Sequence, residues 1–444
     1  MALGVNPILM RDNLNSSRRS FLKSAAASAA AISVPGSVAA LHAAGLVHSG
    51  GGEPLKIGLV GCGGRGSGAA RQALDADNSN ILWAVGDAFM SRVDDSVAAL
   101  DEAMEGSGRT AQLQVPKERR FAGLDCIDRV LDSGVDVILL ASPPGFRPMQ
   151  IEKAVQKGVH IFAEKPVATD APGLRRVRAA CAEARKKSLS VVSGLCYRYH
   201  DGRRAIVKRL QEGAIGDILA IQGNYITGEL WLHQRQPGWS DMENQLHNWL
   251  YYPWLSGDLI AEQHIHSLDV MAWIKGDVYP TRAYSLGGRQ KRVEADYGNV
   301  FDHLATVYEW QDGARGFSYC RQQNGCFRDV DEYVIGTNGT ARIFQHAIAG
   351  KTPWKFDGAI RDMYQAEHDE MFAAIRQGRR IDNSDYMINS TMMAIMGRMA
   401  AYTGKDVSWK EAWESQEQLM PDIVTMDMEP PTATVAIPGI TKFH

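Results

Sequence analysis

The first half of the chain alternates short apolar runs with stretches of helical periodicity. Each apolar run has the length and residue types of a buried strand, and turn residues separate it from the next helix. The predicted strands lie at 54–60, 80–87, 135–142, 158–166 and 188–194, and the predicted helices lie around 91–105, 124–133, 147–157 and 172–187. Strands that alternate with helices form parallel sheets covered on both faces. The pattern therefore predicts an α/β fold for this half.

The second half has a different order of elements. A helix near 202–213 and a strand at 218–225 precede a long polar and aromatic loop, 226–256, and a helix over 258–273. Strands then follow one another near 279–288, 303–310, 314–321, 329–336 and 340–345, with helices near 365–377 and 384–403. Consecutive strands without helices between them predict a large, mostly antiparallel open sheet in an α+β domain.

Composition and charge limit the classes of function. A chain of 444 residues is long enough for two domains, and 45% hydrophobic with 22% charged residues is typical of a globular protein. A net charge of -3 without a long basic run argues against nucleic acid as a partner. None of the six cysteines forms a CxxC pair, so we interpret them as packing residues. An exported protein could form a Cys320–Cys326 disulfide, which the spacing alone cannot show.

The N-terminal segment 1–50 is predicted to be a signal and linker. In "SSRRSFLK", Arg18 and Arg19 precede an apolar, Ala-rich run that ends in a small-residue cleavage site at Val38-Ala39-Ala40. This resembles a twin-arginine export signal, and the run is too short for a membrane span. We expect the folded protein to pass through the twin-arginine export machinery to the periplasm or outside the cell, without a stable membrane anchor.

A glycine-rich turn follows the first predicted strand. Gly61-Cys62-Gly63-Gly64-Arg65-Gly66 matches GxGxxG between a strand that ends at Val60 and a helix that begins within the motif. In such a turn Gly61 permits the bend, Gly63 lets a pyrophosphate approach the backbone, and Gly66 allows close helix–strand packing. Asp87 ends the second strand, where a carboxylate accepts hydrogen bonds from adenosine ribose hydroxyls and repels a 2′-phosphate. The motif predicts a Rossmann dinucleotide-binding domain that takes NAD.

Two further segments carry a family resemblance. "SPPGFRPMQIEKAVQKGVHIFAEKP" (142–166) and "CYRYH" (196–200) resemble the glucose-fructose oxidoreductase, inositol dehydrogenase and MocA family, and the likeness extends over most of 54–410. Its most specific element is Glu164-Lys165-Pro166. The resemblance implies that Lys165 lies beside the nicotinamide and contacts the reacting hydroxyl. In the family the peptide before the proline that matches Pro166 is often cis.

The turn motif and the resemblance together give the expected domains and cofactor residues. We expect an NAD-binding Rossmann domain at 54–195, a substrate-binding α+β domain at 196–415 and an extended tail at 416–444 that lies over the surface or a neighbouring subunit of a homo-oligomer, a dimer or tetramer. The predicted cofactor-binding residues are Gly61, Gly63, Gly64, Arg65, Gly66, Asp87, Ser142, Pro143, Arg147, Glu164, Lys165, Pro166 and Arg198. For Arg147, a surface arginine at a helix start is an equal alternative, because the family often has His there.

The stretch "SGDLIAEQHIHSLDVMAW" (256–273) concentrates acidic and imidazole groups. On one continuous helix Glu262 and His266 share a face, while His264 points nearly the other way. This disfavours a metal site that uses all three, although Glu262 and His266 with a distant His303 or His247, or a buried structural pair, remain alternatives. The resemblance places an aspartate and a histidine four apart on this helix, with Glu262 in the aspartate's position. We favour an acid–base pair that faces Lys165, and no metal.

The loop 226–256 and its neighbours supply candidate substrate contacts. Aromatic faces stack on sugar rings, and imidazole or amide groups bind hydroxyls. An aromatic loop buried under the sheet or at a subunit contact is an equal alternative. The predicted substrate-binding residues are Tyr197, His247, Asn248, Trp249, Tyr252 and His303.

The favoured interpretation is an NAD-dependent oxidoreductase that acts on a secondary hydroxyl of a sugar, glycoside or cyclic polyol. His266, oriented by Glu262, would take the hydroxyl proton, and Lys165 would stabilise the developing alkoxide. The alternative is an NAD-dependent glycosidase that oxidises, eliminates, hydrates and reduces again. A carbohydrate-binding protein that holds nucleotide without catalysis is the third hypothesis.

Overall fold

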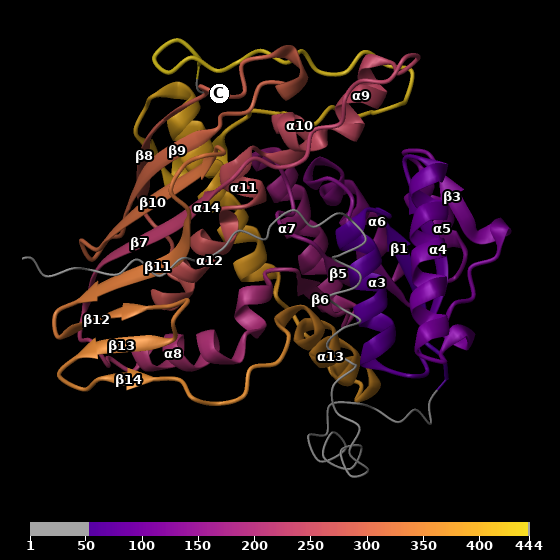
Figure 1. Ribbon diagram of the computed structural model, residues 1–444, viewed down its shortest axis with the longest axis horizontal. Coiled ribbons are helices and arrows are strands. Elements are labelled where there is room, and N and C mark those ends of the chain that lie inside the picture. The colour runs from indigo at the N-terminus through magenta and orange to yellow at the C-terminus, as the bar shows by residue number, and fades with distance from the viewer. Residues whose placement is uncertain (1–52, 443–444) are drawn as a thin grey trace, which may run out of the picture. The chain divides into compact units, whose positions relative to one another are not determined.

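The computed structural model describes residues 53–442, which form two sheets with helices packed on them (Figure 1). The first sheet has the order β3-β2-β1-β4-β5-β6, and all its pairings are parallel. Its strands are β1 (Lys56–Val60), β2 (Ile81–Asp87), β3 (Arg120–Ala122), β4 (Val137–Leu140), β5 (His160–Ala163) and β6 (Val191–Ser193). The predicted parallel sheet is confirmed; only the short β3 was not expected.

Helices cover both faces of this sheet. They are α3 (Gly64–Ala76), α4 (Met90–Gly106), α5 (Cys126–Asp132), α6 (Arg147–Lys157) and α7 (Ala171–Lys186). Because side chains alternate along a strand, Ile138 and Leu140 pack with α5, α6 and α7 on one face, while Val137 and Leu139 pack with α3 and α4 on the other. This two-sided burial explains the continuous apolar runs in the sequence.

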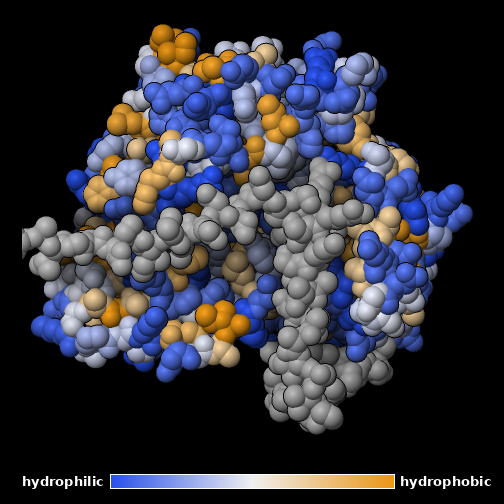
Figure 2. All heavy atoms as spheres, viewed as in Figure 1, coloured by the Kyte–Doolittle hydropathy of each residue, from blue (hydrophilic) through white to orange (hydrophobic). Residues whose placement is uncertain are grey.

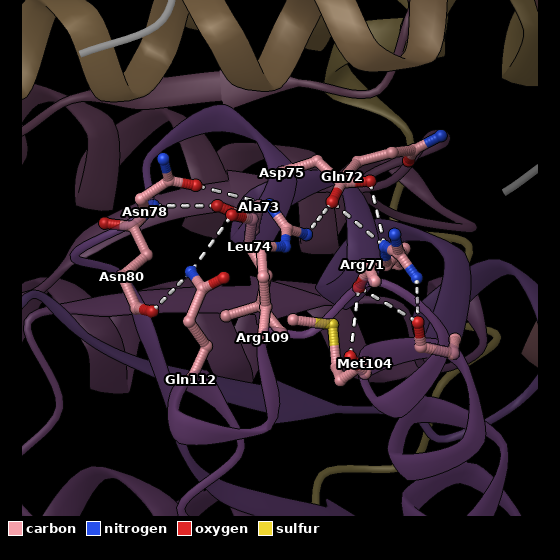
Figure 3. A network of polar contacts seen from close by, with 12 residues as sticks. Arg71, Gln72, Ala73, Leu74, Asp75, Asn78, Asn80, Met104, Arg109 and Gln112 are labelled. Atoms are coloured by element: carbon pink, nitrogen blue, oxygen red, sulfur yellow. Dashed lines mark hydrogen bonds and ion pairs between the residues drawn. The ribbon is translucent and has the colours of Figure 1, made fainter. Parts of the chain in front are cut away.

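A polar network closes the C-terminal end of α3 (Figure 3). The side-chain amide of the buried Gln112, in η1 (Thr110–Gln112), donates to the carbonyls of Leu74, Asp77 and Asn80 at 3.1, 3.0 and 2.8 Å. These carbonyls at and beyond the helix end lack partners within the helix. The network therefore fixes where α3 stops and where β2 begins.

The second sheet has nine strands in the order β14-β13-β12-β11-β7-β10-β9-β8-β15. The β7–β10 pairing is parallel and the other pairings are antiparallel, as expected for a mostly antiparallel open sheet. The strands are β7 (Ile218–Thr227), β8 (Arg282–Gly288), β9 (His303–Glu309), β10 (Arg315–Gln322), β11 (Asp329–Gly336), β12 (Gly339–Arg342), β13 (Ala347–Gly350), β14 (Trp354–Lys355) and β15 (Val407–Ser408).

One face of this sheet carries the helices α11, α12 and α14, which lie between it and the first sheet, while α8 packs on α12 at the lower end of the sheet (Figure 1). The remaining helices are α8 (Asp201–Gln211), α9 (Asp241–His247), α10 (Pro253–Ser256), α11 (Leu259–Glu262), α12 (Ile265–Ile274), α13 (Met363–Arg376), α14 (Ser384–Thr403) and α15 (Trp409–Glu414), with short 3-10 turns at Lys117–Arg119, Pro144–Phe146, Cys196–Tyr199 (η4), Trp249–Tyr251 and Ala295–Tyr297. Helix α13 returns to pack on α3 and η4, so a late segment of the chain supports the glycine turn.

The C-terminal segment 415–442 contains neither helix nor strand and runs along the side that carries α9 and α10 (Figure 1). The backbone N–H groups of Leu419 and Met420 donate to the Asp170 carboxylate at 2.8 and 3.1 Å. Apolar side chains of this segment, among them Val424 and Met428, pack against the aromatic cluster around Trp254. The segment therefore lies on the surface of its own chain.

The surface and the cysteines fit a globular protein. The face in Figure 2 is mostly hydrophilic, with hydrophobic residues in small separate groups. Within 53–442, no helix is both long and apolar enough to cross a membrane. All six cysteines are free, and Cys320 is buried while Cys326 is exposed. The predicted export signal lies outside the described residues.

Candidate active site

The glycine turn has the shape that a dinucleotide requires. Gly61 has φ +98°, and a Cβ there would lie 2.4 Å from the backbone of Ala141 and Ser142. A Cβ on Gly66 would lie 1.8 Å from the Gly61 carbonyl oxygen, whereas a Cβ on Gly63 would meet nothing within 4 Å. Gly63 is the N-cap of α3 and provides no side-chain cap for the N–H groups of the first turn, and the space beside its Cα is open. These residues fit a bound pyrophosphate.

Asp87 reaches back to the same turn from the end of β2. Its Oδ2 accepts from the Cys62 N–H at 2.7 Å, and its Oδ1 accepts from the Phe89 N–H at 3.1 Å. Burial raises the pKa of the carboxyl, and the two backbone N–H groups and Arg92 oppose that rise. The carboxylate is thus fixed at the mouth of the turn, where an adenosine ribose would lie.

The Glu-Lys-Pro segment follows β5, and the Lys165–Pro166 peptide is cis. Lys165 Nζ donates to the backbone carbonyl of Glu262, and it lies 3.0 Å from the Glu262 carboxylate oxygen Oε1. An ammonium group has three N–H donors, so two bonds to Glu262 leave one for another acceptor. Only 14% of the Lys165 side chain is exposed, so a small acceptor bound there would have little competition from water.

The helix predicted over 258–273 is interrupted, which corrects the geometry expected for Glu262 and His266. Helix α11 ends at Glu262 and α12 begins at Ile265. In a continuous helix the Glu262 carbonyl would accept from the His266 N–H. Instead that N–H faces the Gln263 carbonyl at 3.5 Å, and the Glu262 carbonyl accepts from Lys165. The interruption therefore provides the acceptor that anchors the lysine.

His266 is buried beside the lysine but is not paired with Glu262. Its ring lies 4.7 Å from the Tyr197 ring, with 30° between their planes. Its Nδ1 has no hydrogen-bond partner among the described residues. Burial, followed by the positive charges of Lys165 and Arg203, lowers the pKa of His266 well below its usual range. The imidazole is therefore neutral at neutral pH, the form that accepts a proton; the expected orienting contact from Glu262 is absent.

Arg65 and Glu164 meet across the turn. Arg65 Nε lies 2.7 Å from Glu164 Oε1, and the guanidinium lies over the Tyr364 ring at 4.9 Å. The Glu164 carboxylate also occupies the space beside Gly194, where a Cβ would lie 2.6 Å from it. The ion pair joins the first turn of α3 to the residue that precedes Lys165.

Arg147 is buried and is not the surface arginine of the alternative interpretation. It donates to the backbone carbonyls of Pro166 and of Ser142, the latter at 2.6 Å. Burial lowers the pKa of its guanidinium to about 10. Ser142 in turn donates to the Gln150 side chain at 2.6 Å, and Pro143 is the residue before the 3-10 turn Pro144–Phe146. Arg147 therefore supports the backbone on both sides of the predicted cofactor site.

Arg198 is held in a buried ion pair, which differs from its predicted cofactor contact. Its guanidinium donates to the Asp269 carboxylate at 2.8 to 3.1 Å and to Asp277 at 2.6 Å. It also lies over the Tyr386 ring at 4.0 Å. The arginine thus joins η4 to α12, because its donors face carboxylates of its own domain.

The other histidines of the predicted metal alternatives lie apart from this arrangement. His264 is fully buried, its Nε2 lies 2.6 Å from the Ser318 hydroxyl, and burial lowers its pKa to about 3. His303 Nδ1 lies 2.7 Å from the Asp302 carboxylate. Within residues 53–442, no group of three or more His, Cys, Asp or Glu side chains is placed to share a metal ion.

Three of the predicted substrate residues, Asn248, Trp249 and Tyr252, contact other residues of the loop 226–256. Asn248 is buried, and its amide bonds to both the N–H and the carbonyl of His233 at 2.9 Å. Tyr252 is buried, and Trp249 lies 6.0 Å from Trp231. These contacts fit the alternative of a buried aromatic loop, and binding of substrate by these residues stays a prediction.

His247, another member of this set, contacts the first domain. Its ring is stacked between Phe89, at 4.1 Å, and Trp239, at 4.0 Å. Phe89 was not predicted as a site residue, and its only signal in the sequence is its position two residues after Asp87. The loop 226–256 therefore contacts the segment that follows the predicted ribose-binding carboxylate.

Comparison with known families agrees with this architecture. Residues 55–193 match a family described as an oxidoreductase family with an NAD-binding Rossmann fold, and residues 204–342 match the GFO/IDH/MocA C-terminal domain. Together the two matches cover more than half of the chain. The chain belongs to the Gfo/Idh/MocA oxidoreductase family. Residues 15–35 of this Gfo/Idh/MocA protein also match a twin-arginine translocation signal.

Curated relatives of this Gfo/Idh/MocA protein are distant. The 2,7-anhydro-N-acetylneuraminate hydratase of Escherichia coli (strain K12) is 25% identical over 239 residues, which are 53% of this chain and 59% of the hydratase. The inositol 2-dehydrogenase of Ralstonia nicotianae is 27% identical over 316 residues, 68% of this chain and 80% of the relative. The chain spans about half the length of the first curated relatives it matches, between 46% and 59%.

Solved structures share the fold of this Gfo/Idh/MocA protein. The scyllo-inositol dehydrogenase of Lactobacillus casei with bound NAD(H) and scyllo-inositol has a TM-score of 0.60 and 20% identity, covering 81% of this chain and 100% of the other. The aldose-aldose oxidoreductase of Caulobacter crescentus, complexed with glycerol, has a TM-score of 0.60 and 17% identity, covering 80% and 100%. At these identities the likeness establishes the fold alone.

Proposed function

We propose that the protein is an NAD-dependent oxidoreductase that oxidises a secondary hydroxyl of a sugar, glycoside or cyclic polyol. The observation that carries the proposal is the position of Lys165, whose ammonium is anchored by Glu262 next to the buried His266. An anchored cation can stabilise the alkoxide, and a neutral imidazole can accept the hydroxyl proton, when hydride leaves an alcohol.

NAD fits the turn that Gly61, Gly63 and Gly66 form, with Asp87 at the ribose and Arg65, Glu164 and Arg147 supporting the surrounding backbone. When bound, NAD would accept the hydride from the substrate carbon. The carboxylate of Asp87 would disfavour a 2′-phosphate, which is why NAD rather than NADP is proposed.

The protein residues would handle the proton and the charge. The free N–H of Lys165 would donate to the substrate oxygen and stabilise its negative charge as the hydride leaves. His266 would take the hydroxyl proton and later release it to solvent. A lowered pKa makes His266 a weak base, and the nearby ammonium offsets this because it also lowers the pKa of the bound hydroxyl.

The substrate class rests on the relatives, which include inositol 2-dehydrogenases and sugar-linked enzymes. The twin-arginine match supports export of the folded protein with its cofactor, and the periplasm as its location is part of the proposal. A homo-oligomer, a dimer or tetramer, is also proposed.

A panel of free sugars, glycosides and cyclic polyols tests the proposal. The purified protein is incubated with each compound and NAD, and product and reduced cofactor are measured together. We expect equal amounts of a keto product and NADH with at least one class. A panel that covers all three classes without any NADH or altered sugar would reject the proposed oxidation.

A redox-neutral reaction is the second candidate, because two of the first curated relatives are 2,7-anhydro-N-acetylneuraminate hydratases. Transient oxidation acidifies the neighbouring C–H, so elimination and addition of water become feasible before the hydride returns. In heavy water, such a reaction would place deuterium beside the oxidised carbon without net reduction of NAD. Labelled product with no NADH would favour this candidate over net oxidation.

A further inference from the structure

A continuous line of contacts leads from His266 to a buried ion pair in the nine-stranded sheet. The Tyr197 ring lies 4.7 Å from the His266 ring. On Tyr197, the Arg203 guanidinium carbon lies 3.6 Å from the ring centroid. Arg203 Nη1 then lies 3.4 Å from Glu332 Oε2. All four side chains are buried, so the line is shielded from water.

The four residues come from four separate elements. Tyr197 is in η4, Arg203 is in α8, His266 is in the first turn of α12, and Glu332 is in β11. Glu332 stands at an inward-facing position of an alternating strand, where an apolar residue is usual. The line therefore connects η4, α8 and α12 to the strand β11 of the nine-stranded sheet.

An ion pair in this position needs a reason beyond stability. Moving two charges out of water costs several kcal/mol per ion, and their mutual attraction recovers a similar free energy. A pair of apolar residues in the same place is therefore often as stable. Burial raises the pKa of Glu332 to about 7, and Arg203 opposes that rise. One oxygen of Glu332, Oε1, has no hydrogen-bond partner among the described residues. The pair is thus incompletely satisfied, although the Arg203 guanidinium carbon lies only 3.6 Å from the Tyr197 ring centroid.

The groups around His266 give the arginine a role. Positive charge faces His266 from Lys165 and from Arg203, and both lower its pKa after burial. The titratable groups in this surrounding are Lys165 after β5, Tyr197 in η4, Arg203 in α8, Tyr225 in β7, His264 before α12 and Glu332 in β11. Glu262 pairs with Lys165, and within residues 53–442 the Nδ1 atom of His266 has no hydrogen-bond partner. The Tyr197 ring contacts the imidazole, and the Arg203 charge lies behind that ring.

We infer that Arg203 is a positioning residue for His266. It fixes the Tyr197 ring against the imidazole and, held by Glu332, adds to the positive charge that faces the imidazole. The inference rests on the proposed function, in which His266 takes the hydroxyl proton. It assigns no contact with substrate or cofactor to Arg203 itself.

The test compares Arg203→Met with Arg204→Met. Arg204 is the neighbour on α8, is paired with Glu370 at 2.6 Å, and is 36% exposed, so its loss removes the same charge on another face. For Arg203→Met we expect kcat to fall about 10- to 100-fold with KM changed less than about threefold. We expect the acid limb of the kcat profile to move to higher pH, because lost positive charge raises the pKa of His266. Arg204→Met should stay within about twofold of the parent.

Three further forms control for folding and for charge. Arg203→Lys keeps the charge, so its pH profile should match that of the parent. Its kcat should be lower than that of the parent, because an ammonium group is not planar and cannot stack on the Tyr197 ring. Arg203→Met/Glu332→Gln removes both charges and avoids a buried carboxylate without its cation; it should retain the upward pH shift. Glu332→Gln alone should move the acid limb to lower pH, since the arginine is then uncompensated.

A measurement on the cofactor-free protein separates this inference from the proposed function. In histidine-labelled full-length protein, the His266 ring protons are shifted by the ring current of Tyr197. Loss of Arg203 should change that shift, and loss of Arg204 should not. If the parent oxidises no substrate but the shift changes, the proposed function fails while the positioning contact stands. If the parent is active and both arginine variants behave alike in shift and in pH profile, the inference is wrong.

Discussion

Phe89 and His247 stack with ring centroids 4.1 Å apart and planes 11° from parallel. The contact joins the loop after β2 to the end of α9, so it ties the aromatic loop 226–256 to the proposed ribose site. Trp239 covers the other face of the imidazole at 4.0 Å. Burial lowers the pKa of His247 to about 4, so an uncharged ring holds the two segments together at neutral pH.

If this stack closes the adenosine side of the site, its loss should speed cofactor release. A stacked aromatic pair contributes about 0.5–1.5 kcal/mol beyond area burial, which corresponds to a release of NAD about two- to tenfold faster in His247→Ala. His247→Phe keeps an uncharged ring and should release NAD at nearly the parent rate. The rate is measured by dilution of the NAD-loaded protein into an NAD trap. Equal rates in the Ala and Phe variants would show that the stack does not retain the nucleotide.

Gly63 and Gly66 offer a matched pair for the turn. Gly66→Ala places a Cβ 1.8 Å from the Gly61 carbonyl oxygen, and overpacking of this kind costs about 1–3 kcal/mol of unfolding free energy. Gly63→Ala meets nothing within 4 Å and has an extended backbone (φ -74°, ψ -179°), so its stability should not change. Its added methyl group would instead obstruct a pyrophosphate and weaken NAD binding by about tenfold or more. Calorimetric titration and denaturant unfolding measure both effects; normal NAD affinity in Gly63→Ala would move the nucleotide away from this turn.

Asp87→Asn tests the choice of dinucleotide. The amide oxygen can still accept from the Cys62 N–H, while the negative charge that would repel a 2′-phosphate is lost. We expect the ratio of NAD to NADP affinity to narrow by about 10- to 100-fold, since a charged hydrogen bond contributes about 1.5–3 kcal/mol. Binding of both dinucleotides is measured side by side. A parent protein that prefers NADP would contradict the role given to Asp87.

Lys165→Met should abolish most of the chemistry and leave the nucleotide site intact. Removing the cation that stabilises the alkoxide should lower kcat by about 10²–10³-fold, with the Kd for NAD nearly unchanged. Glu262→Gln keeps the backbone carbonyl that accepts from Lys165, so its loss of kcat should be smaller, about tenfold. Steady-state kinetics and nucleotide titration give the two values. Unchanged turnover in Lys165→Met would place the reacting centre elsewhere.

The elements built on local pattern could be predicted, and the contacts made across the sequence could not. Alternation of apolar residues located β9, β10 and β11 within one or two residues, because inward and outward positions alternate on a half-buried strand. The glycine turn could also be predicted, since Gly61 and Gly66 stand where a side chain would clash with nearby backbone. The Phe89–His247 stack joins residues on different elements, and no periodicity within either element signals it.

The break between α11 and α12 shows why the site itself was only partly predictable. Apolar periodicity through 258–273 supports a continuous helix, and on that helix Glu262 and His266 would be neighbours. In the structure the Glu262 carbonyl accepts a hydrogen bond from Lys165, 97 residues away in sequence, instead of from the helix. Apolar periodicity predicts which side chains of a helix are buried. It does not predict which backbone carbonyl will accept a hydrogen bond from a distant ammonium group.

Buried neutral histidines give the fold a predictable dependence on pH. His264 has a folded pKa of about 3, against about 6.5 when unfolded, because it lies fully buried against Ser318. As pH falls below about 6.5 the unfolded state takes up the proton first, so stability is lost between about pH 6.5 and pH 3. At pH 5 this one group should cost about 2 kcal/mol of the unfolding free energy present at pH 7.5. Burial shifts His266 and His368 in the same direction.

Denaturant unfolding of the parent and of His264→Gln at pH 7.5 and pH 5 isolates that contribution. Glutamine can keep a hydrogen bond to the Ser318 hydroxyl and has no proton to gain in this range. The variant should be less stable than the parent at pH 7.5 because the ring packing is lost, and this deficit should shrink by about 2 kcal/mol at pH 5. A deficit of the same size at both pH values would mean that His264 is protonated alike in the folded and unfolded chain, contrary to its burial.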